Sequence, residues 1–495
     1  MNVFAYFLRN SVIRLLTFVV GVGAVFWVTP HVLRCLGTSA YGTFALIIGL
    51  AVYYMLFEFG IYNSIAKKSA EERVKGNQNE IDALYTTGLA LGVGFFCVIM
   101  ALGLGIAVFA VAFFADAEFI GAAQYSIAIF TCSIGILVMA RPAFGILAGA
   151  MRWNLLAFLA MGRTISTSIG ALVFLTPELP AAENLLRMAI VNGLFFAMEG
   201  IAMLVAVRMG RHATVCFSSV SMEKIKLLLH FGTPLLVMQI GAILRSRTQI
   251  YILAVVLTPA ALTFYSLARQ FVVYMQDIIS NAFGILNPYF SRLQAEGNAD
   301  GYRHTLLEAL RFSYTTSCLI GLGLILYGDA FITRWLGSDF LDVYTILFPL
   351  ALAGIMEHGE IPAHGFLVGI GKHKVLAQLS LGLGVFITVF SFPAAWLWGF
   401  RGIAWVVCLL TLVNCMVLMP SLVSRAAEMP VWRYYRMLLV TLGPQVAAQV
   451  AYYYCIREFI SPEYISIFLC AIGQTLVCAI VFLISVFHLL RKTHK

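Results

Sequence analysis

Charged side chains are scarce in this sequence. Only 11% of its 495 residues are Asp, Glu, Lys or Arg, whereas a typical soluble domain carries roughly 25%. The hydrophobic fraction is 61% and the mean hydropathy is +0.92. This number of charges is too small to cover a water-facing surface. We therefore expect a membrane protein and exclude a soluble one.

Paired cysteines are also lacking. The ten cysteines lie mostly in apolar runs, and no C-x-x-C pair and no H-E-x-x-H arrangement occurs. Zinc sites and disulfide frameworks need such spacings, so we expect neither a metal nor a cofactor. The cysteines are interpreted as small apolar packing residues. The first apolar stretch has no clear cleavage site and is long enough to be a retained span.

Fourteen apolar segments account for most of the chain. A bilayer needs about 20 such residues per helix. The sequence therefore predicts an all-α polytopic protein whose spans lie near residues 12–34, 41–64, 84–113, 120–150, 153–175, 185–207, 227–256, 261–289, 306–329, 342–370, 375–397, 403–423, 437–457 and 464–489. The loops between them are too short to fold as soluble domains.

The charges in the loops predict the orientation. Lys and Arg accumulate on the cytoplasmic side. With the N-terminus inside, the inner loops hold most of the basic residues, including Lys67, Lys68, Arg208, Lys372 and Arg433. The outer loops hold Arg34, Arg334, Arg401 and Arg457, together with many acids. Both termini are therefore predicted to be cytoplasmic.

An internal repeat divides the spans. Residues 142–152 and 362–372 both read P-A-x-G-x-L-x-G-x-x-(K/R), at equivalent places six spans apart. An even number of spans preserves orientation, so the halves are predicted to be parallel repeats, a pattern found in transporters. We expect a six-helix lobe over 1–210, a second over 211–425, and two further helices over 426–495.

Charges inside the predicted spans are candidate functional residues, because each costs about 2.5–3.5 kcal/mol at the centre of a helix. The basic members are all arginines, and none is lysine. The planar guanidinium binds phosphate in bidentate fashion, so the pattern fits a diphosphate ligand. The candidates for an anionic diphosphate and sugar cavity are Arg14, Arg141, Arg245, Arg247 and Arg269.

Some of these arginines have neighbours that affect the interpretation. Arg245 and Arg247 are two positions apart and cannot both face one cavity squarely. Arg269 and Asp277 are two turns apart and nearly share a face. Arg14 and Glu58 lie toward the cytoplasmic ends of their spans, as either a local pair or a substrate entrance. Arg163 and Glu199 could form a structural pair between helices.

The acids and one histidine are candidates for ion coupling or charge balance. They are Glu58, Asp277, Glu357, Glu360 and His364. The last three follow i, i+3, i+7 spacing on one predicted helix and share a face. A proton or sodium relay, a metal site and a hydrogen-bonded helix contact are all compatible with that spacing. The relay is favoured over the metal site because carboxylates and imidazoles titrate readily in a low dielectric.

Several short motifs resemble the Wzx-type O-antigen and polysaccharide flippases, of the multidrug/oligosaccharidyl-lipid/polysaccharide exporter superfamily. They are Leu33-Arg34-Cys35-Leu36-Gly37 followed by Tyr41-Gly42, Phe57-Glu58-Phe59-Gly60-Ile61, Tyr265-Ser266-Leu267-Ala268-Arg269, Trp335-Leu336-Gly337 and Gly369-Ile370-Gly371-Lys372. The resemblance implies a two-lobed, cation-lined cavity. It would move undecaprenyl-diphosphate-linked oligosaccharide repeat units from the cytoplasmic to the periplasmic leaflet of the bacterial inner membrane, for O-antigen or other surface polysaccharide.

The expected partners follow from that resemblance. They are the lipid-linked oligosaccharide, membrane lipids, a proton or sodium ion in antiport, and the polysaccharide polymerase machinery; no nucleic acid is expected. The alternative is a cation-coupled multidrug or metabolite antiporter of the same superfamily, which would favour acidic and aromatic cavity residues instead. A polytopic glycosyltransferase or polymerase would need a substantial periplasmic loop, so we do not expect an enzyme.

Overall fold

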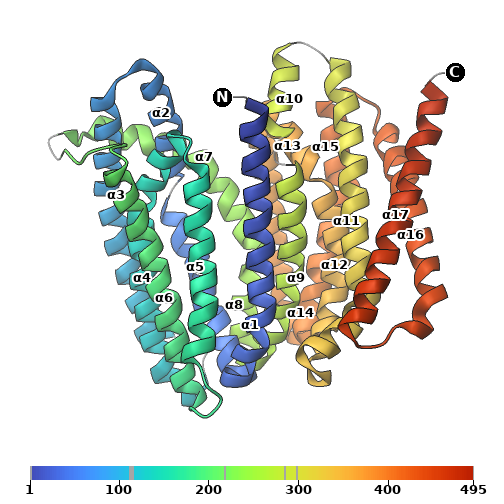
Figure 1. Ribbon diagram of the computed structural model, residues 1–495, viewed down its shortest axis with the longest axis horizontal. Coiled ribbons are helices and arrows are strands. Elements are labelled where there is room, and N and C mark those ends of the chain that lie inside the picture. Colours follow the sequence, from blue (N-terminus) through green and yellow to red (C-terminus); the bar gives the residue numbers. More distant parts are fainter. Residues whose placement is uncertain are drawn as a thin grey trace. The chain divides into compact units, whose positions relative to one another are not determined.

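The protein is all-helical in the part of the chain that its computed structural model describes, which is residues 3–58, 60–110, 116–216, 219–283, 286–296 and 299–493 (Figure 1). No strand occurs in those ranges. Lipid offers no hydrogen bonds to the backbone, and a helix satisfies its own. The predicted fold class, an all-α polytopic membrane protein, is confirmed.

The helices follow one another with short connections. In the first half they are α1 (Val3–Tyr54), η1 (Met55–Glu58), α2 (Ile61–Lys75), α3 (Gln78–Gly105), η2 (Ile106–Ala110), η4 (Ala117–Phe119), α4 (Ile120–Gly149), α5 (Trp153–Phe174), α6 (Ala181–Met209) and α7 (Met222–Ser246). In the second half they are α8 (Thr248–Val256), α9 (Pro259–Phe283), α10 (Leu286–Ala295), α11 (Ala299–Leu336), η6 (Ser338–Phe340), α12 (Asp342–Gly359), α13 (Ile361–Gly369), α14 (His373–Val413), η7 (Asn414–Leu418), α15 (Met419–Ala426), α16 (Val431–Ile456), η8 (Arg457–Phe459) and α17 (Tyr464–Thr493).

Eight helical segments of the described chain are long and apolar enough to cross a membrane. Two of them, Thr17–Glu58 and Lys374–Ala426, each cover most or all of two predicted spans. In each, one glycine leaves the helical region: Gly37 with φ 70° and Gly399 with φ 62°. These backbone angles are open to glycine at little cost, so each glycine separates two spans.

The remaining predicted spans fall on α7 with α8, α9, α12 with α13, and α16. Two of these four are interrupted, and each interruption lies at a charged residue. Arg247 separates α7 from α8, and Glu360 separates α12 from α13. Discontinuous helices of this kind occur where membrane transporters bind substrates or ions.

The end of the second span differs from the prediction. The range 41–64 was expected to be one helix followed by a loop. Instead the helix ends through η1 at Glu58, and α2 begins at Ile61 and continues to Lys75. Gly60 has φ 65° and breaks the path between them. The following stretch is polar, which hid this helix from a search for apolar runs.

The chain forms two compact units. The first comprises residues 1–243 and 253–263, and the second comprises residues 244–252 and 264–495. In the first unit α4 packs against α2, α3 and α6, and in the second α11 packs against α12, α16 and α17. The division predicted at residues 210 and 425 rests on which spans correspond to one another in the sequence repeat. It stays a prediction.

The two copies of the repeated motif end in the same backbone structure. After α4, the amide of Arg152 donates to Leu147 O at 2.9 Å and that of Met151 to Ala148 O at 2.9 Å. After α13, Lys372 donates to Leu367 O at 2.8 Å and Gly371 to Val368 O at 3.1 Å. Both are Schellman caps, with Met151 at φ 58° and Gly371 at φ 77°. The repeat is therefore structural as well as sequential.

The last two helices are fastened to α11 by buried amides. Gln474 of α17 donates to Gln449 Oε1 of α16 at 2.6 Å and to Leu319 O of α11 at 3.4 Å. Gln445 of α16 donates to Cys478 O of α17 at 3.1 Å. Polar side chains that find partners across helices hold membrane helices together. Thus α16 and α17 pack as an integral part of the second unit.

Candidate substrate and ion sites

An arginine and a glutamate pair in the interior of the first unit. Arg141 Nε of α4 lies 3.0 Å from Glu58 Oε2, which η1 carries. The side chains are 21% and 7% exposed. Glu58 Oε1 is buried without a hydrogen-bond partner. Each charge compensates the other, as charges within membrane helices normally require.

Two aromatic rings hold the same guanidinium. Its Cζ lies 4.6 Å from the ring centre of Tyr62 and 4.6 Å from that of Phe144. Because Glu58 engages Nε, and no hydrogen bond links Nη1 or Nη2 to any described residue, the outer edge of the guanidinium is available. Arginine binds oxyanions through such an edge. The arrangement fixes the guanidinium in one orientation.

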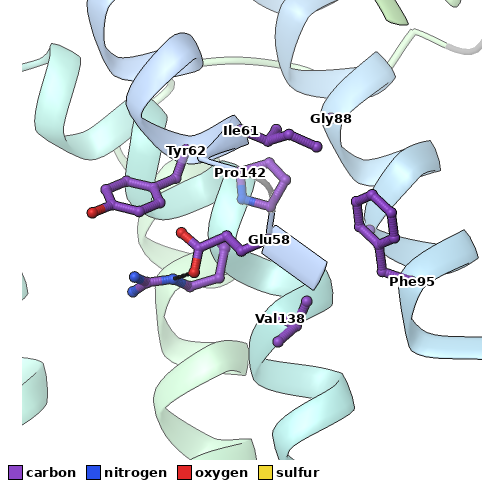
Figure 2. A pocket seen from close by; sticks show the side chains of 9 residues that line it. Glu58, Ile61, Tyr62, Gly88, Phe95, Val138 and Pro142 are labelled. Atoms are coloured by element: carbon purple, nitrogen blue, oxygen red, sulfur yellow. Dashed lines mark hydrogen bonds and ion pairs between the residues drawn. The ribbon is translucent and has the colours of Figure 1, made fainter. Parts of the chain in front are cut away.

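A small pocket adjoins this pair. It is lined by Glu58, Tyr62, Arg141 and Pro142, with Phe95 and Val138 among the other residues. Figure 2 shows the Glu58 carboxylate beneath the Tyr62 ring, with Phe95 on the opposite side. The part of the pocket in which the centre of a water molecule can lie measures about 10 Å³. This is close to the minimum that one buried water needs. The pocket therefore has room for a water, and a sugar would not fit.

A second arginine–glutamate pair lies in the second unit. Arg245 Nη1, near the end of α7, lies 2.8 Å from Glu357 Oε1 of α12. The charge of Glu357 also interacts with those of Arg269 and His364. Arg269 Nε is buried without a hydrogen-bond partner. The structure thus brings Arg245, Arg269, Glu357 and His364 into one cluster.

Arg247 and Asp277 lie close enough for their charges to interact. Arg247 occupies the break between α7 and α8, and Asp277 lies on α9. The closely spaced arginines therefore have different acids, with Glu357 beside Arg245 and Asp277 beside Arg247. Arg269 and Asp277 share a helix and also differ in their neighbours.

Glu360 has no such counter-ion contact. It is 1% exposed, and neither carboxyl oxygen has a hydrogen-bond partner. It occupies the break before Pro362. Proline has no amide hydrogen, so Pro362 cannot donate to the carbonyl of His358; Ser313 Oγ of α11 donates to it instead, at 3.2 Å. The carbonyl that the break exposes therefore has a hydrogen-bond donor, and the break places the Glu360 carboxyl group in the core.

The other predicted site residues are placed as follows. Arg14 lies on α1 within residues 3–16, whose side chains fall outside the described part of the chain. Arg163 Nε pairs with Glu199 Oε2 at 2.7 Å, and its guanidinium lies 4.4 Å from the Phe196 ring centre. Among the described residues no group of three or more His, Cys, Asp or Glu is arranged to hold a metal ion.

The sequence analysis did not find the aromatic and thiol groups around these charges. Tyr62 and Phe144 surround Arg141, and Tyr314, Cys415 and Tyr434 lie around Glu360. In so apolar a chain an aromatic residue gives no separate signal, because core, lipid-facing and site positions have the same composition. These three kinds of position differ only in which helices pack around them.

Comparison with known proteins places these features in a wider group. The sequence model of a family described as polysaccharide biosynthesis protein matches residues 32–345. That range includes Arg141 and Glu58 and the arginines of α7 and α9. No curated protein gives a significant match.

Solved structures share the fold at low sequence identity. One described as the lipid II flippase MurJ in an inward closed conformation has a TM-score of 0.72 and 13% identity, over 99% of this chain and 100% of that one. An inward-facing multidrug resistance MATE family transporter of the MOP superfamily has a TM-score of 0.69 and 15% identity, over 84% of this chain and 99% of that one. A MOP superfamily transporter from Pyrococcus furiosus has a TM-score of 0.54 and 14% identity, over 85% and 97%.

Proposed function

Since the chain belongs to the polysaccharide biosynthesis protein family, we propose that it is a flippase for an undecaprenyl-diphosphate-linked oligosaccharide. It would move the repeat unit from the cytoplasmic to the periplasmic leaflet by alternating access, in the assembly of O-antigen or another surface polysaccharide. The MOP superfamily transporter fold of the chain is compatible with such a cycle.

The observation that supports this substrate most strongly is the state of Arg141. A charged group in the membrane interior is costly unless it has a use or a partner. Glu58 occupies only Nε, the two rings fix the guanidinium plane, and the outer edge stays available. A diphosphate has oxygens in the geometry that this edge binds.

The second unit would supply further positive charge. Arg269 carries a buried Nε without a hydrogen-bond partner beside the Arg245–Glu357 pair. In the proposal, Arg245, Arg247 and Arg269 attract the diphosphate, and Arg14 contributes near the cytoplasmic end. Glu58 balances the charge of Arg141 and Asp277 that of Arg247, and Glu357, Glu360 and His364 take part in coupling to a proton or sodium ion.

The membrane setting belongs to the same proposal. The chain would lie in the bacterial inner membrane with both termini cytoplasmic, as the loop charges predict. Contact with the polymerase that uses the exported repeat unit would follow from its place in assembly. These points rest on the sequence pattern and on the family.

A cation-coupled multidrug or metabolite antiporter is the second candidate. The fold is compatible with this candidate, because the structural match to a MATE family transporter covers 84% of this chain with a TM-score of 0.69. A cavity for cationic drugs would gain from acidic residues without partners, however. In the described chain Glu58 and Glu357 are each paired with an arginine. Glu360 has no such partner, but it is only 1% exposed, so none of these three acids presents a free carboxylate to a cationic drug.

Deletion of the gene separates the two candidates. For a flippase, lipid-linked oligosaccharide should accumulate on the cytoplasmic leaflet and surface polysaccharide should be lost. Normal surface polysaccharide together with altered drug tolerance would instead support the antiporter.

Arg269 tests the proposed anion site. Because the ammonium group of lysine cannot form a bidentate contact, Arg269→Lys should lose most export and Arg269→Ala nearly all. Full export by both variants would remove Arg269 from the site.

A further inference from the structure

The second unit contains a carboxyl group in surroundings that suit neither a salt bridge nor a metal ion. Glu360 is 1% exposed, and neither of its oxygens makes a hydrogen bond of standard geometry, although the Cys415 thiol and the Tyr314 hydroxyl lie near enough to interact with it. The polar groups nearest to it are hydroxyls and a thiol. They are Tyr314 of α11, Cys415 of η7 and Tyr434 of α16, each fully buried.

Those neighbours form a compact group. Tyr314 and Tyr434 approach each other at 3.4 Å between their hydroxyl oxygens. Gly359 permits this placement, because a Cβ there would lie 2.2 Å from Cδ1 of the Tyr314 ring. Cys415 lies in a π-helical turn, a distortion that is frequent at functional sites. The helix break, the glycine and the π-turn all converge on the same carboxyl group.

The next shell is apolar. Tyr314, Cys415 and Tyr434 belong to a core that also contains Met356, Phe366 and Met419. A hard metal cation would need several oxygen ligands, and among the described residues no group of three or more His, Cys, Asp or Glu is arranged to hold one. A carboxylate left uncompensated in such a core is strongly disfavoured. A proton removes the charge and needs no extra volume.

The charged groups that face Glu360 do not replace that proton. Glu357 of α12 adds negative charge, and Arg245 of α7 is already paired with Glu357 at 2.8 Å. The groups acting on Glu360 from the elements around it are Tyr314, Cys415, Tyr434, Glu357 and Arg245.

We propose that Glu360 is a buried proton-binding site, which takes up and releases one proton in each transport cycle. On uptake an O–H bond of a hydronium ion breaks and one forms on a carboxylate oxygen. On release the carboxyl O–H bond breaks and the proton returns to water as hydronium. The part of this proposal that concerns the transport cycle rests on the proposed function, whereas the protonated carboxyl group does not.

The same site assigns a role to α16. Tyr434, on one of the two helices that follow the repeat, lies close enough to Glu360 for the two groups to interact electrostatically. The helix α16 therefore completes the polar environment of the carboxyl group as well as packing against α11. Removing the Tyr434 hydroxyl should shift the frequency of the carbonyl band of the Glu360 carboxyl group, and the band itself should remain.

Infrared difference spectroscopy on the full-length protein tests the site directly. The protein is placed in vesicles of phosphatidylethanolamine and phosphatidylglycerol, and the pH is raised stepwise. We expect a carbonyl band of a protonated carboxylic acid that decreases with rising pH and is lost in Glu360→Gln. Glu357→Gln and the exposed surface variant Glu296→Gln should keep it. An unchanged band in Glu360→Gln would overturn the proposal.

A second variant covers the case in which Glu360→Gln fails to fold. Tyr434→Phe removes one hydroxyl, and the band should then shift in frequency. If the band of Tyr434→Phe coincides with that of the native protein, the assignment to Glu360 is wrong.

Transport is measured separately, so that the two proposals can fail separately. Vesicles containing a fluorescent undecaprenyl-diphosphate-linked disaccharide are given an imposed pH gradient. The native protein and Glu296→Gln should flip the probe faster with the gradient than without it, and Glu360→Gln should lose that acceleration. No flipping by the native protein would refute the proposed function and leave the infrared result standing. Flipping by Glu360→Gln that still accelerates would refute the coupling role.

Discussion

The two halves of the repeat carry opposite charges on equivalent helices. α4 contributes Arg141 to its unit, whereas α12 and α13, the equivalent stretch, contribute Glu357 and Glu360 to the other. By the repeat, Glu357 corresponds to Leu137 and Glu360 to Ala140. In each unit another element supplies the counter-ion, Glu58 from η1 and Arg245 from α7.

The comparison separates what the repeat shares from what it does not. Both copies end in the same cap, where Arg152 and Lys372 make the same hydrogen bond, although α4 is continuous and its counterpart is interrupted at Glu360. The polar chemistry is not shared, because one unit presents the edge of a guanidinium and the other encloses a carboxyl group. The two units thus differ in the charged groups that they contain, and variants can probe one unit at a time.

The largest effect is expected from Arg141→Ala. It leaves Glu58 buried without its partner, which costs roughly 3–5 kcal/mol for a buried pair, and it removes the proposed anion contact. Export should be lost, and the free energy of unfolding in mixed micelles should fall. Glu58→Gln with Arg141→Ala removes both charges, so it should recover much of the stability and none of the export. Recovery of export as well would exclude Arg141 from the substrate site.

In the second unit, exchanging the two charges tests whether the pair is mainly structural. Arg245→Glu alone places two acids together and should destabilise by about 3 kcal/mol. Adding Glu357→Arg restores opposite charges and should recover most of that loss in the same unfolding measurement. A double variant no more stable than Arg245→Glu would show that the pair depends on geometry that the exchange does not reproduce.

The aromatic clamp on Arg141 should have a smaller effect. Tyr62→Leu removes one ring from the guanidinium, and cation–π contacts contribute about 0.5–2 kcal/mol. Tyr62→Phe keeps the ring and serves as the matched control. Export should fall in the leucine variant because the guanidinium loses its fixed plane. Equal export by the two variants would argue against orientation by the ring.

The smallest effect concerns the two caps. Gly371 has a left-handed conformation that costs other residues about 1 kcal/mol, so Gly371→Ala should destabilise by that amount. Met151 occupies the equivalent position at φ 58°, so Met151→Gly should be neutral or slightly stabilising. Thermal unfolding of both variants measures the difference. A destabilised Met151→Gly would mean that the Met151 side chain makes contacts that outweigh the backbone strain.

The sequence predicted the parts of this architecture that depend on composition and period. Fourteen spans, the repeat and the two-lobed fold class follow from apolar runs and from the motif at Pro142 and Pro362. The helix α2 was missed because its polar residues interrupt the apolar pattern, and Gly60 is no different in sequence from a glycine within a span. The helix breaks at Arg247 and Glu360 could not be predicted from hydropathy either, because the segments around them are apolar on both sides.

The partners of the charged residues could not be predicted for a different reason. Helical spacing states which side chains share a face, but it does not state which helix that face meets. Glu357, Glu360 and His364 were predicted to act together. In the structure Glu357 pairs with Arg245, whereas Glu360 lies among hydroxyls and a thiol. His364 does interact with Glu357, as the spacing predicts, whereas Glu360 occupies the break between α12 and α13, where helical periodicity does not determine the surroundings of a side chain.

The position of Tyr434 has a consequence for biosynthesis. Chains are made at about 5–20 residues per second, so several seconds pass between the synthesis of Glu360 and that of α16. During that time the carboxyl group lacks one of its enclosing hydroxyls, and α11 lacks the amides of Gln449 and Gln474. The second unit therefore matures only when its last helices arrive, and a ribosome stalled between Glu360 and Tyr434 should leave a nascent chain that membrane quality control recognises as unfinished.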